Sequence, residues 1–129
     1  MKICCIVPIK HNSERVPGKN YRSFNGKPLF EIIVEKLLKC DMISTIVIDT
    51  NSPIIESAVQ DKYKEKNIIL YRRPEHLWNG TTPTNVLIEN VIQDLNLKFD
   101  LFMQTHVTNP LLSIETIKKC IETYKIQLE

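Results

Sequence analysis

Short apolar runs of strand length alternate with apolar residues at helical spacing from one end of the chain to the other. We expect strands at residues 2–7, 45–49, 67–71 and 99–104. Helices are expected to begin at Pro28, at Ser52 and Pro53, near Thr82 and Pro83, and after Ser113. Strands that alternate with helices form right-handed crossovers, so the fold class is α/β, with three layers and a sheet of mostly parallel strands.

Each expected helix carries its apolar residues at the spacing of one buried face. The residues predicted to be buried are Leu29, Ile32, Ile33, Leu37 and Cys40, then Ile54, Ile55, Ala58 and Val59, then Val86, Leu87, Val91, Ile92 and Leu95, and finally Ile114, Ile117, Ile121 and Tyr124. The four cysteines fall inside apolar patterns and not at the spacings of metal ligands. They are Cys4, Cys5, Cys40 and Cys120, and we interpret them as reduced core thiols.

Composition excludes several classes of protein. The 129 residues suit one domain, and 43% apolar and 25% charged residues are ordinary for a globular chain. A formal net charge of +2 is too small to argue for a nucleic-acid or membrane partner. The first apolar run, residues 3–7, is far shorter than the roughly 18 residues that cross a bilayer, and no secretory signal is present. We therefore expect a cytoplasmic protein.

The unusual polar residues follow the expected strands at the point where each strand ends. They lie in residues 10–20, 49–51, 72–84 and 104–109, whereas the connections at the other ends of the strands are short and plain. The carboxyl ends of parallel strands meet at one edge of a sheet, and ligands of open α/β sheets bind there. One edge of the sheet is therefore predicted to be functional.

The loop after the first strand is suited to phosphate groups. It carries the cations Lys10, Arg15 and Lys19, and Pro17 and Gly18 stiffen and expose its backbone just before Lys19. The sequence contains neither G-x-x-x-x-G-K-S/T nor G-x-G-x-x-G, which disfavours P-loop kinases and Rossmann dehydrogenases. The loop predicts a nucleotide site of another kind.

The same loop resembles the signature of the acylneuraminate cytidylyltransferase family, close to P-x-R/K-x-x-S-x-x-x-P-x-K-N. Here the matching residues are Pro8, Lys10, Ser13, Pro17, Lys19 and Asn20. Three further segments resemble family motifs in the same order: Gly26 to Leu29, Arg73 to Leu77, and Thr108 to Leu111. The resemblance implies a Rossmann-like nucleotidyltransferase fold of the GT-A-like kind.

The resemblance also implies a reaction and a set of site residues. CMP from CTP would be joined to an acidic sugar, a nonulosonate such as neuraminate, with release of pyrophosphate. Lys10 and Lys19 are implied as catalytic residues, and the implied nucleotide-binding residues are Lys10, Asn12, Ser13, Arg15, Lys19, Asn20, Arg73, Thr82 and Thr84. His106 and Thr108 are implied to bind the sugar. Members of the family use Mg²⁺ and are homodimers, so both are expectations here, and no metal ligand is assigned.

Three positions depart from the family pattern. The family's S-T-D is here Asp49-Thr50-Asn51, the family's acid in the segment after the Arg73 to Leu77 motif is here Gly80, and a Gln is here His106. Asp49 is interpreted as an acid of the turn that ends its strand. Gly80 removes an acceptor, which predicts looser recognition of the base or ribose.

The length of the chain leaves alternatives open. Members of the family are longer, so residues 1–129 are predicted to be the nucleotide-binding part, truncated after the fourth strand and its helix, with the carboxy-terminal half absent. One alternative is a non-catalytic nucleotide-binding module of the same fold. Another is a nucleotide-sugar-dependent glycosyltransferase, which would need an acid-x-acid motif where this chain has Gln104-Thr105-His106.

Overall fold

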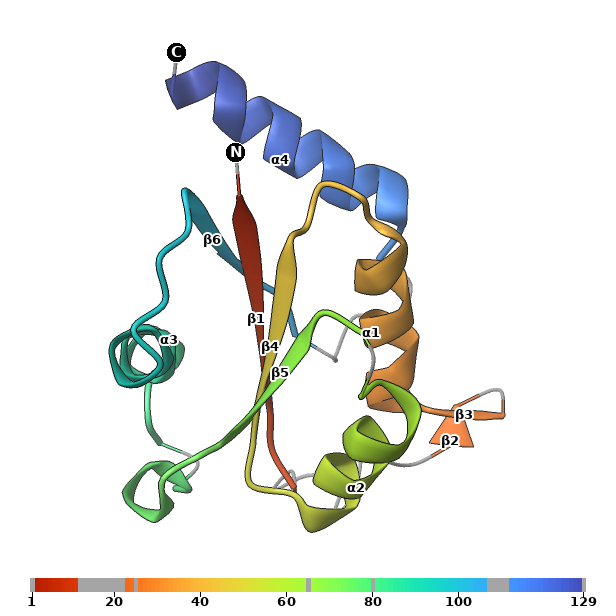
Figure 1. Cartoon of the computed structure of the whole chain (residues 1–129), viewed down its shortest axis with the longest axis vertical. Helices are drawn as coiled ribbons and strands as arrows, with labels where there is room; N and C mark the ends of the chain where they lie inside the picture. The colour runs from red at the N-terminus through yellow and green to blue at the C-terminus, as the bar shows by residue number, and fades with distance from the viewer. Residues whose placement is uncertain are drawn as a thin grey trace.

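The computed structural model describes residues 2–11, 23–24, 26–64, 66–79, 81–106 and 112–128. In chain order the elements are β1 (Ile3–Ile9), β2 (Ser23–Phe24), β3 (Lys27–Pro28), α1 (Leu29–Lys39), β4 (Thr45–Thr50), α2 (Pro53–Lys62), β5 (Ile68–Arg72), η2 (Glu75–Leu77), α3 (Thr84–Asp94), β6 (Leu101–Gln104) and α4 (Ile114–Leu128) (Figure 1). The four predicted strands and four predicted helices are present, which confirms the α/β class. The antiparallel hairpin of β2 and β3 was not predicted.

The main sheet is parallel and has the order β5-β4-β1-β6. Successive strands are added on one side of β1 as far as β5, and the chain then crosses back to place β6 on the other side. The strand order therefore reverses beside β1, and the carboxyl ends of β1 and β6 border the topological switch point where α/β sheets bind ligands. We call the edge at which the four strands end the carboxyl edge.

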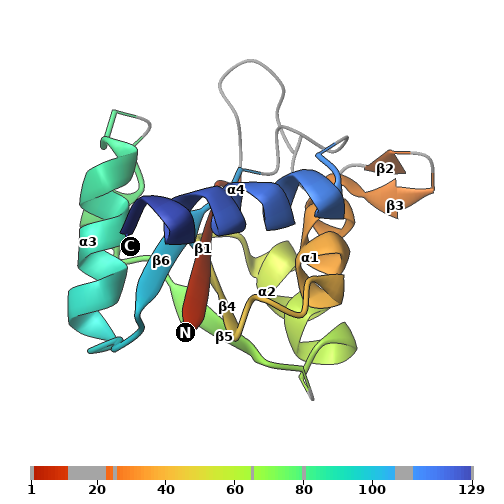
Figure 2. The ribbon, with the colours of Figure 1, turned by 90° about the horizontal axis from the view of Figure 1, so that it is seen from above.

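Helices cover both faces of the sheet because β1 is apolar on both. Cys5 and Val7 face a cluster that includes residues of α1, α2 and α4, while Cys4 and Ile6 face a second cluster with α3. Figure 2 shows α3 on one side of the strands and α1 and α2 on the other. Alternating side chains of a central strand point to opposite faces, so a continuous apolar run is what this position requires.

Helix α1 shows how local spacing produces the core. Phe30, Ile33, Val34 and Leu37 lie on one stripe of the helix and are buried. Glu31 is also buried, and its Oε1 accepts from Lys62 Nζ at 2.5 Å and from the Tyr63 hydroxyl at 3.4 Å. This ion pair ties the first turn of α1 to the end of α2.

Three residues predicted to be buried are exposed: Ile54, Val86 and Tyr124. Ile54 and Val86 each precede a buried residue, and one step along a helix turns a side chain by about 100°, so only the neighbour faces the sheet. Tyr124 lies seven residues after the buried Ile117, on the same face of α4, but near the end of the helix. Within the described residues, no helix is long and apolar enough to span a membrane.

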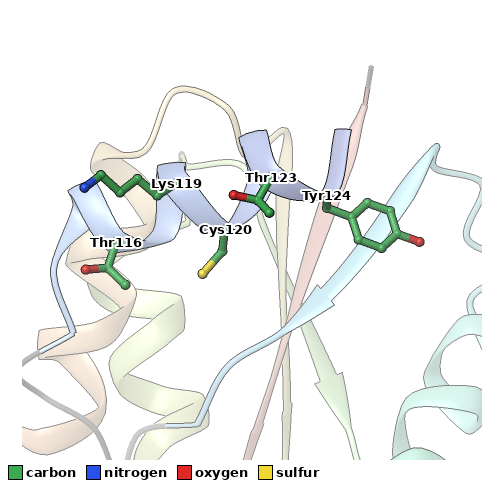
Figure 3. Close-up of a pocket in the computed structure, with 5 residues that line it drawn as sticks. All are labelled: Thr116, Lys119, Cys120, Thr123 and Tyr124. Carbon is green, nitrogen blue, oxygen red and sulfur yellow. The ribbon is translucent and has the colours of Figure 1, made fainter. Parts of the chain in front are cut away.

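The cysteine prediction is confirmed at three positions and wrong at one. Cys4, Cys5 and Cys40 are buried, whereas Cys120 is exposed on α4. Figure 3 shows Cys120 lining a pocket with Thr116, Lys119, Thr123 and Tyr124. Ile117 and Ile121 form the buried stripe of α4, and Cys120 lies beside this stripe. Its side chain is therefore exposed although the next residue in sequence, Ile121, is buried.

Cys120 is expected to be the one thiol of the four that reacts rapidly with an aromatic disulfide reagent in the folded chain. Burial raises the pKa of Cys4 to about 11 and raises the pKa of Cys5 further, so both stay protonated at neutral pH. The measurement is the rate of thiolate release at pH 8, with and without denaturant. Cys120→Ser should abolish the fast phase, and a fast phase of two or more thiols would contradict the burial.

Candidate functional site

The loop after β1 begins at the carboxyl edge and is fixed to the start of α2. Lys10 is exposed directly after β1. The backbone N–H of His11 donates to Asn51 Oδ1 at 2.8 Å, and His11 Nδ1 lies 2.7 Å from Ser52 Oγ. That same hydroxyl caps α2 by accepting from the N–H of Ile55 at 3.3 Å. The first residues of the loop after β1 are thereby held against the turn between β4 and α2.

Asp49 and Arg73 form a buried ion pair at the same edge. Arg73 Nε donates to Asp49 Oδ1 at 3.1 Å, and Arg73 Nη2 donates to the Asp49 carbonyl oxygen at 3.2 Å. The two side chains are 1% and 0% exposed. Asp49 therefore lies inside β4 as the partner of Arg73, and the prediction that it is a turn acid is wrong. Parallel pairing of β4 with β5 brings the two together, because Thr50 is opposite Arg72.

The charge of Asp49 depends on Arg73. Burial raises the pKa of Asp49, and the positive charge and hydrogen bond of Arg73 offset part of this rise. Within the described residues, Asp49 Oδ2 is buried without a hydrogen-bond partner. Removing either partner would leave a buried charge uncompensated, which is far costlier than losing a surface pair.

The segment after β5 is organised by short-range hydrogen bonds. Trp78 Nε1 donates to the Arg73 carbonyl oxygen at 2.7 Å, although the indole is 47% exposed. Asn79 Oδ1 accepts from the hydroxyls of Thr81 and Thr82 at 2.8 and 2.9 Å. The half-buried Thr84 is the first residue of α3. Arg73, Thr82 and Thr84 thus lie on one continuous segment at the carboxyl edge.

His106 is exposed two residues beyond the end of β6. In the parallel register Ile6 is opposite Gln104, so the residues that follow β1 and β6 leave the sheet at the same edge. Lys10 and His106 therefore border the switch point from neighbouring strands. The other predicted site residues lie outside the described residues: Asn12, Ser13, Arg15, Lys19, Asn20 and Thr108. Gly80 is also outside them.

The described residues do not form a metal site. No three His, Cys, Asp or Glu side chains among them lie close enough together to hold an ion. Asp49, a buried acid at the carboxyl edge, is paired with Arg73. The donor set of this part of the chain therefore does not fit a protein-bound Mg²⁺.

The described residues place Lys10, Arg73 and His106 along the carboxyl edge of a parallel sheet, and comparison with known proteins decides the family of the chain. A sequence model described as cytidylyltransferase matches residues 4–129, nearly the whole chain. The chain belongs to the cytidylyltransferase family. The resemblance found in the sequence motifs is thereby confirmed at the level of acidic-sugar cytidylyltransferases.

Two curated relatives of this cytidylyltransferase chain act on acidic sugars according to their names. Pseudaminic acid cytidylyltransferase of Campylobacter jejuni is 29% identical over 128 residues, which cover 96% of this chain and 53% of the relative. CMP-N,N'-diacetyllegionaminic acid synthase of Legionella pneumophila is 32% identical over 133 residues, covering 98% of this chain and 54% of the relative. The chain spans about half the length of the curated relatives it matches.

A solved structure supports the fold of the cytidylyltransferase chain. CMP:2-keto-3-deoxy-manno-octonic acid synthetase, complexed with CTP, superposes with a TM-score of 0.77 at 21% identity. The superposition covers 97% of this chain and 48% of that protein. At this identity the likeness establishes the fold, and the Rossmann-like prediction is confirmed.

Some residues of the candidate site were missed by sequence reasoning. His11, Asn51 and Ser52 were not predicted to join the first loop to α2, and Trp78 was not singled out. The signal for His11 was its place directly after Lys10, at the start of the polar loop. No local signal indicated that Trp78 would bond to the backbone of Arg73.

Proposed function

We propose that this chain is the CTP-binding part of an enzyme that transfers CMP from CTP to an acidic sugar of the nonulosonate class, such as neuraminate, with release of pyrophosphate. The observation that carries the proposal is the match of the cytidylyltransferase family across residues 4–129. The relatives named for pseudaminic and legionaminic acids support an acidic sugar as acceptor. Because the chain spans about half of these relatives, the complete activity is part of the proposal.

The proposed chemistry needs the triphosphate held and its charge offset. A hydroxyl oxygen of the sugar attacks the α-phosphorus, the bond from this phosphorus to the bridging oxygen breaks, and pyrophosphate leaves with the electron pair. Lys10 and Lys19 are proposed to stabilise the negative charge that develops on the phosphate oxygens. The position of Lys10 at the switch point supports this role.

The remaining residues are proposed to orient the two substrates. Asn12, Ser13, Arg15 and Asn20 would contact the nucleotide from the first loop, and Arg73, Thr82 and Thr84 would do so from the segment after β5. His106 and Thr108 would contact the sugar from the connection after β6. The arrangement of their described members along one edge of the sheet supports this division.

Three further features are proposed. Mg²⁺ would enter bound to the triphosphate, since phosphate oxygens are its usual ligands. The free, buried cysteines Cys4, Cys5 and Cys40 favour a reducing compartment, which supports a cytoplasmic location. The active enzyme is proposed to be a homodimer, which sedimentation of a version as long as the relatives would test.

Release of pyrophosphate tests the proposed function. The chain is incubated with CTP, Mg²⁺ and each of several acidic sugars, beside a version as long as the relatives. Pyrophosphate release that requires both CTP and the sugar supports the transfer reaction. Binding of CTP without release by either version would favour the alternative, a non-catalytic nucleotide-binding module, which the half-length coverage keeps open.

CTP is expected to bind about five- to tenfold more tightly than UTP, the effect of about one hydrogen bond to the base. The reason is that Arg73, Thr82 and Thr84 are proposed to contact the cytidine, whereas Gly80 offers no side-chain acceptor. Calorimetric titrations with CTP, UTP, ATP and GTP at one salt concentration measure the preference. Tighter binding of ATP or GTP than of CTP would contradict the cytidylyl assignment.

A further inference from the structure

We propose that Asp49 is a positioning residue that holds Arg73, and through Arg73 the segment 73–79, in the geometry needed to distinguish CTP from UTP. This inference rests on the proposed function, because it concerns the segment to which nucleotide recognition is assigned above. Asp49 itself is not proposed to touch the nucleotide. Its effect is exerted through the two bonds that it makes with Arg73.

Asp49 holds the guanidinium of Arg73 from two directions. The carboxylate accepts from Nε at 3.1 Å, and the backbone carbonyl of the same residue accepts from Nη2 at 3.2 Å. Arg73 Nη1 is the nitrogen that neither bond uses. The Arg73 side chain is only 1% exposed, so the orientation of its guanidinium is set by β4 and not by solvent.

Backbone and side-chain bonds connect Arg73 to the residues before and after it. Its backbone N–H donates to the Thr50 carbonyl at 3.0 Å, and its carbonyl accepts from Trp78 Nε1 at 2.7 Å. Leu77, between them, is buried. The exposed indole of Trp78 is therefore held at the carboxyl edge by a bond whose acceptor belongs to the residue that Asp49 anchors.

Asp94 offers a control that separates positioning of Arg73 from a general effect on stability. Tyr71, two residues before Arg73, donates its hydroxyl to Asp94 Oδ2 at 2.7 Å on the opposite side of the sheet from α1 and α2. Asp94 thus also bonds a side chain at the end of β5, but it has no bond with Arg73 or Trp78 among those described. Asp94→Asn is the matched control for Asp49→Asn, since both replace a bonded carboxylate by an amide.

The test compares these variants by two readouts. The first is the ratio of CTP to UTP affinity by calorimetry, and the second is the emission of Trp78, the only tryptophan of the chain. Asp49→Asn is expected to lower the ratio about fivefold, toward one, because a neutral amide holds the guanidinium less firmly. It should also shift the Trp78 emission to longer wavelength and increase its quenching by acrylamide. Asp94→Asn should leave both readouts at the parent values.

A second variant covers the case in which Asp49→Asn does not fold. Asp49→Glu keeps the charge but moves the carboxylate by one methylene, and the same two changes are expected from it. A folded Asp49 variant that keeps the parent ratio or the parent emission overturns the proposal, as does Asp94→Asn causing the same changes. If the parent chain binds neither nucleotide, the proposed function fails for this chain and the Trp78 emission alone decides whether Asp49 positions the segment.

Discussion

Lys10→Ala is expected to weaken binding of CTP by about 1.5–3 kcal/mol, the usual effect of losing a charge-assisted contact with phosphate. Lys10 follows β1 directly and borders the switch point of the sheet, where a bound triphosphate would concentrate negative charge. Calorimetric titration with CTP at fixed salt measures the loss. The binding should also become less sensitive to salt, because one charge fewer is neutralised.

Two control variants test whether the loss of CTP affinity is specific to the position of Lys10. Lys10→Arg keeps the positive charge and is expected to bind CTP nearly as well as the parent. Lys98→Ala removes an equal charge from the connection before β6, at the opposite edge of the sheet, and should leave the affinity unchanged. Equal losses in Lys10→Ala and Lys98→Ala would mean that net charge, and not the site, attracts the nucleotide.

Phe30→Ala is expected to lower the free energy of unfolding by about 3–5 kcal/mol. Phe30 is among the largest fully buried side chains, and it packs in the cluster that joins α1, α2 and α4 to the sheet. Its removal leaves a cavity that the rigid strands cannot close by relaxation. Urea unfolding followed by circular dichroism measures the change in midpoint.

Ile54→Ala is the control for this prediction. Ile54 is a large apolar residue on the neighbouring helix α2, but it is 49% exposed, so its truncation should change the free energy of unfolding by less than about 1 kcal/mol. A loss as small for Phe30→Ala as for Ile54→Ala would contradict the assignment of Phe30 to the core. A loss as large for Ile54→Ala as for Phe30→Ala would contradict the orientation of α2, in which Ile55 and not Ile54 faces the sheet.

Much of the fold could be predicted because it is encoded by local spacing. The apolar run of β1 and the stripe of α1 each identify their element without reference to the rest of the chain. Helix α2 begins at Pro53 with Ser52 as its cap, as predicted from those two residues alone. Alternation of strands and helices then restricts the sheet to a parallel one and brings the polar loops to one edge.

Partners distant in the sequence could not be predicted in the same way. Asp49 and Arg73 are 24 residues apart, and their pairing depends on the register of β4 with β5. The sequence pattern predicted an acid of the turn that ends the strand, because an acid at the end of an apolar run usually marks a turn. In the folded chain both side chains are buried near the strand ends, and a buried charge needs a partner, so Asp49 pairs with Arg73.

By itself, the sequence determined the four strands of the main sheet, the four helices, the edge at which the polar loops gather and the cytidylyltransferase family, since each rests on residues close together or on motifs in order along the chain. Only the tertiary structure decided that Asp49 is tied to Arg73, that His11 is tied to α2, and that Cys120 faces outward. These contacts depend on strand register and on how each helix is rotated against the sheet. Both are set by the packing of the whole core and not by any one segment.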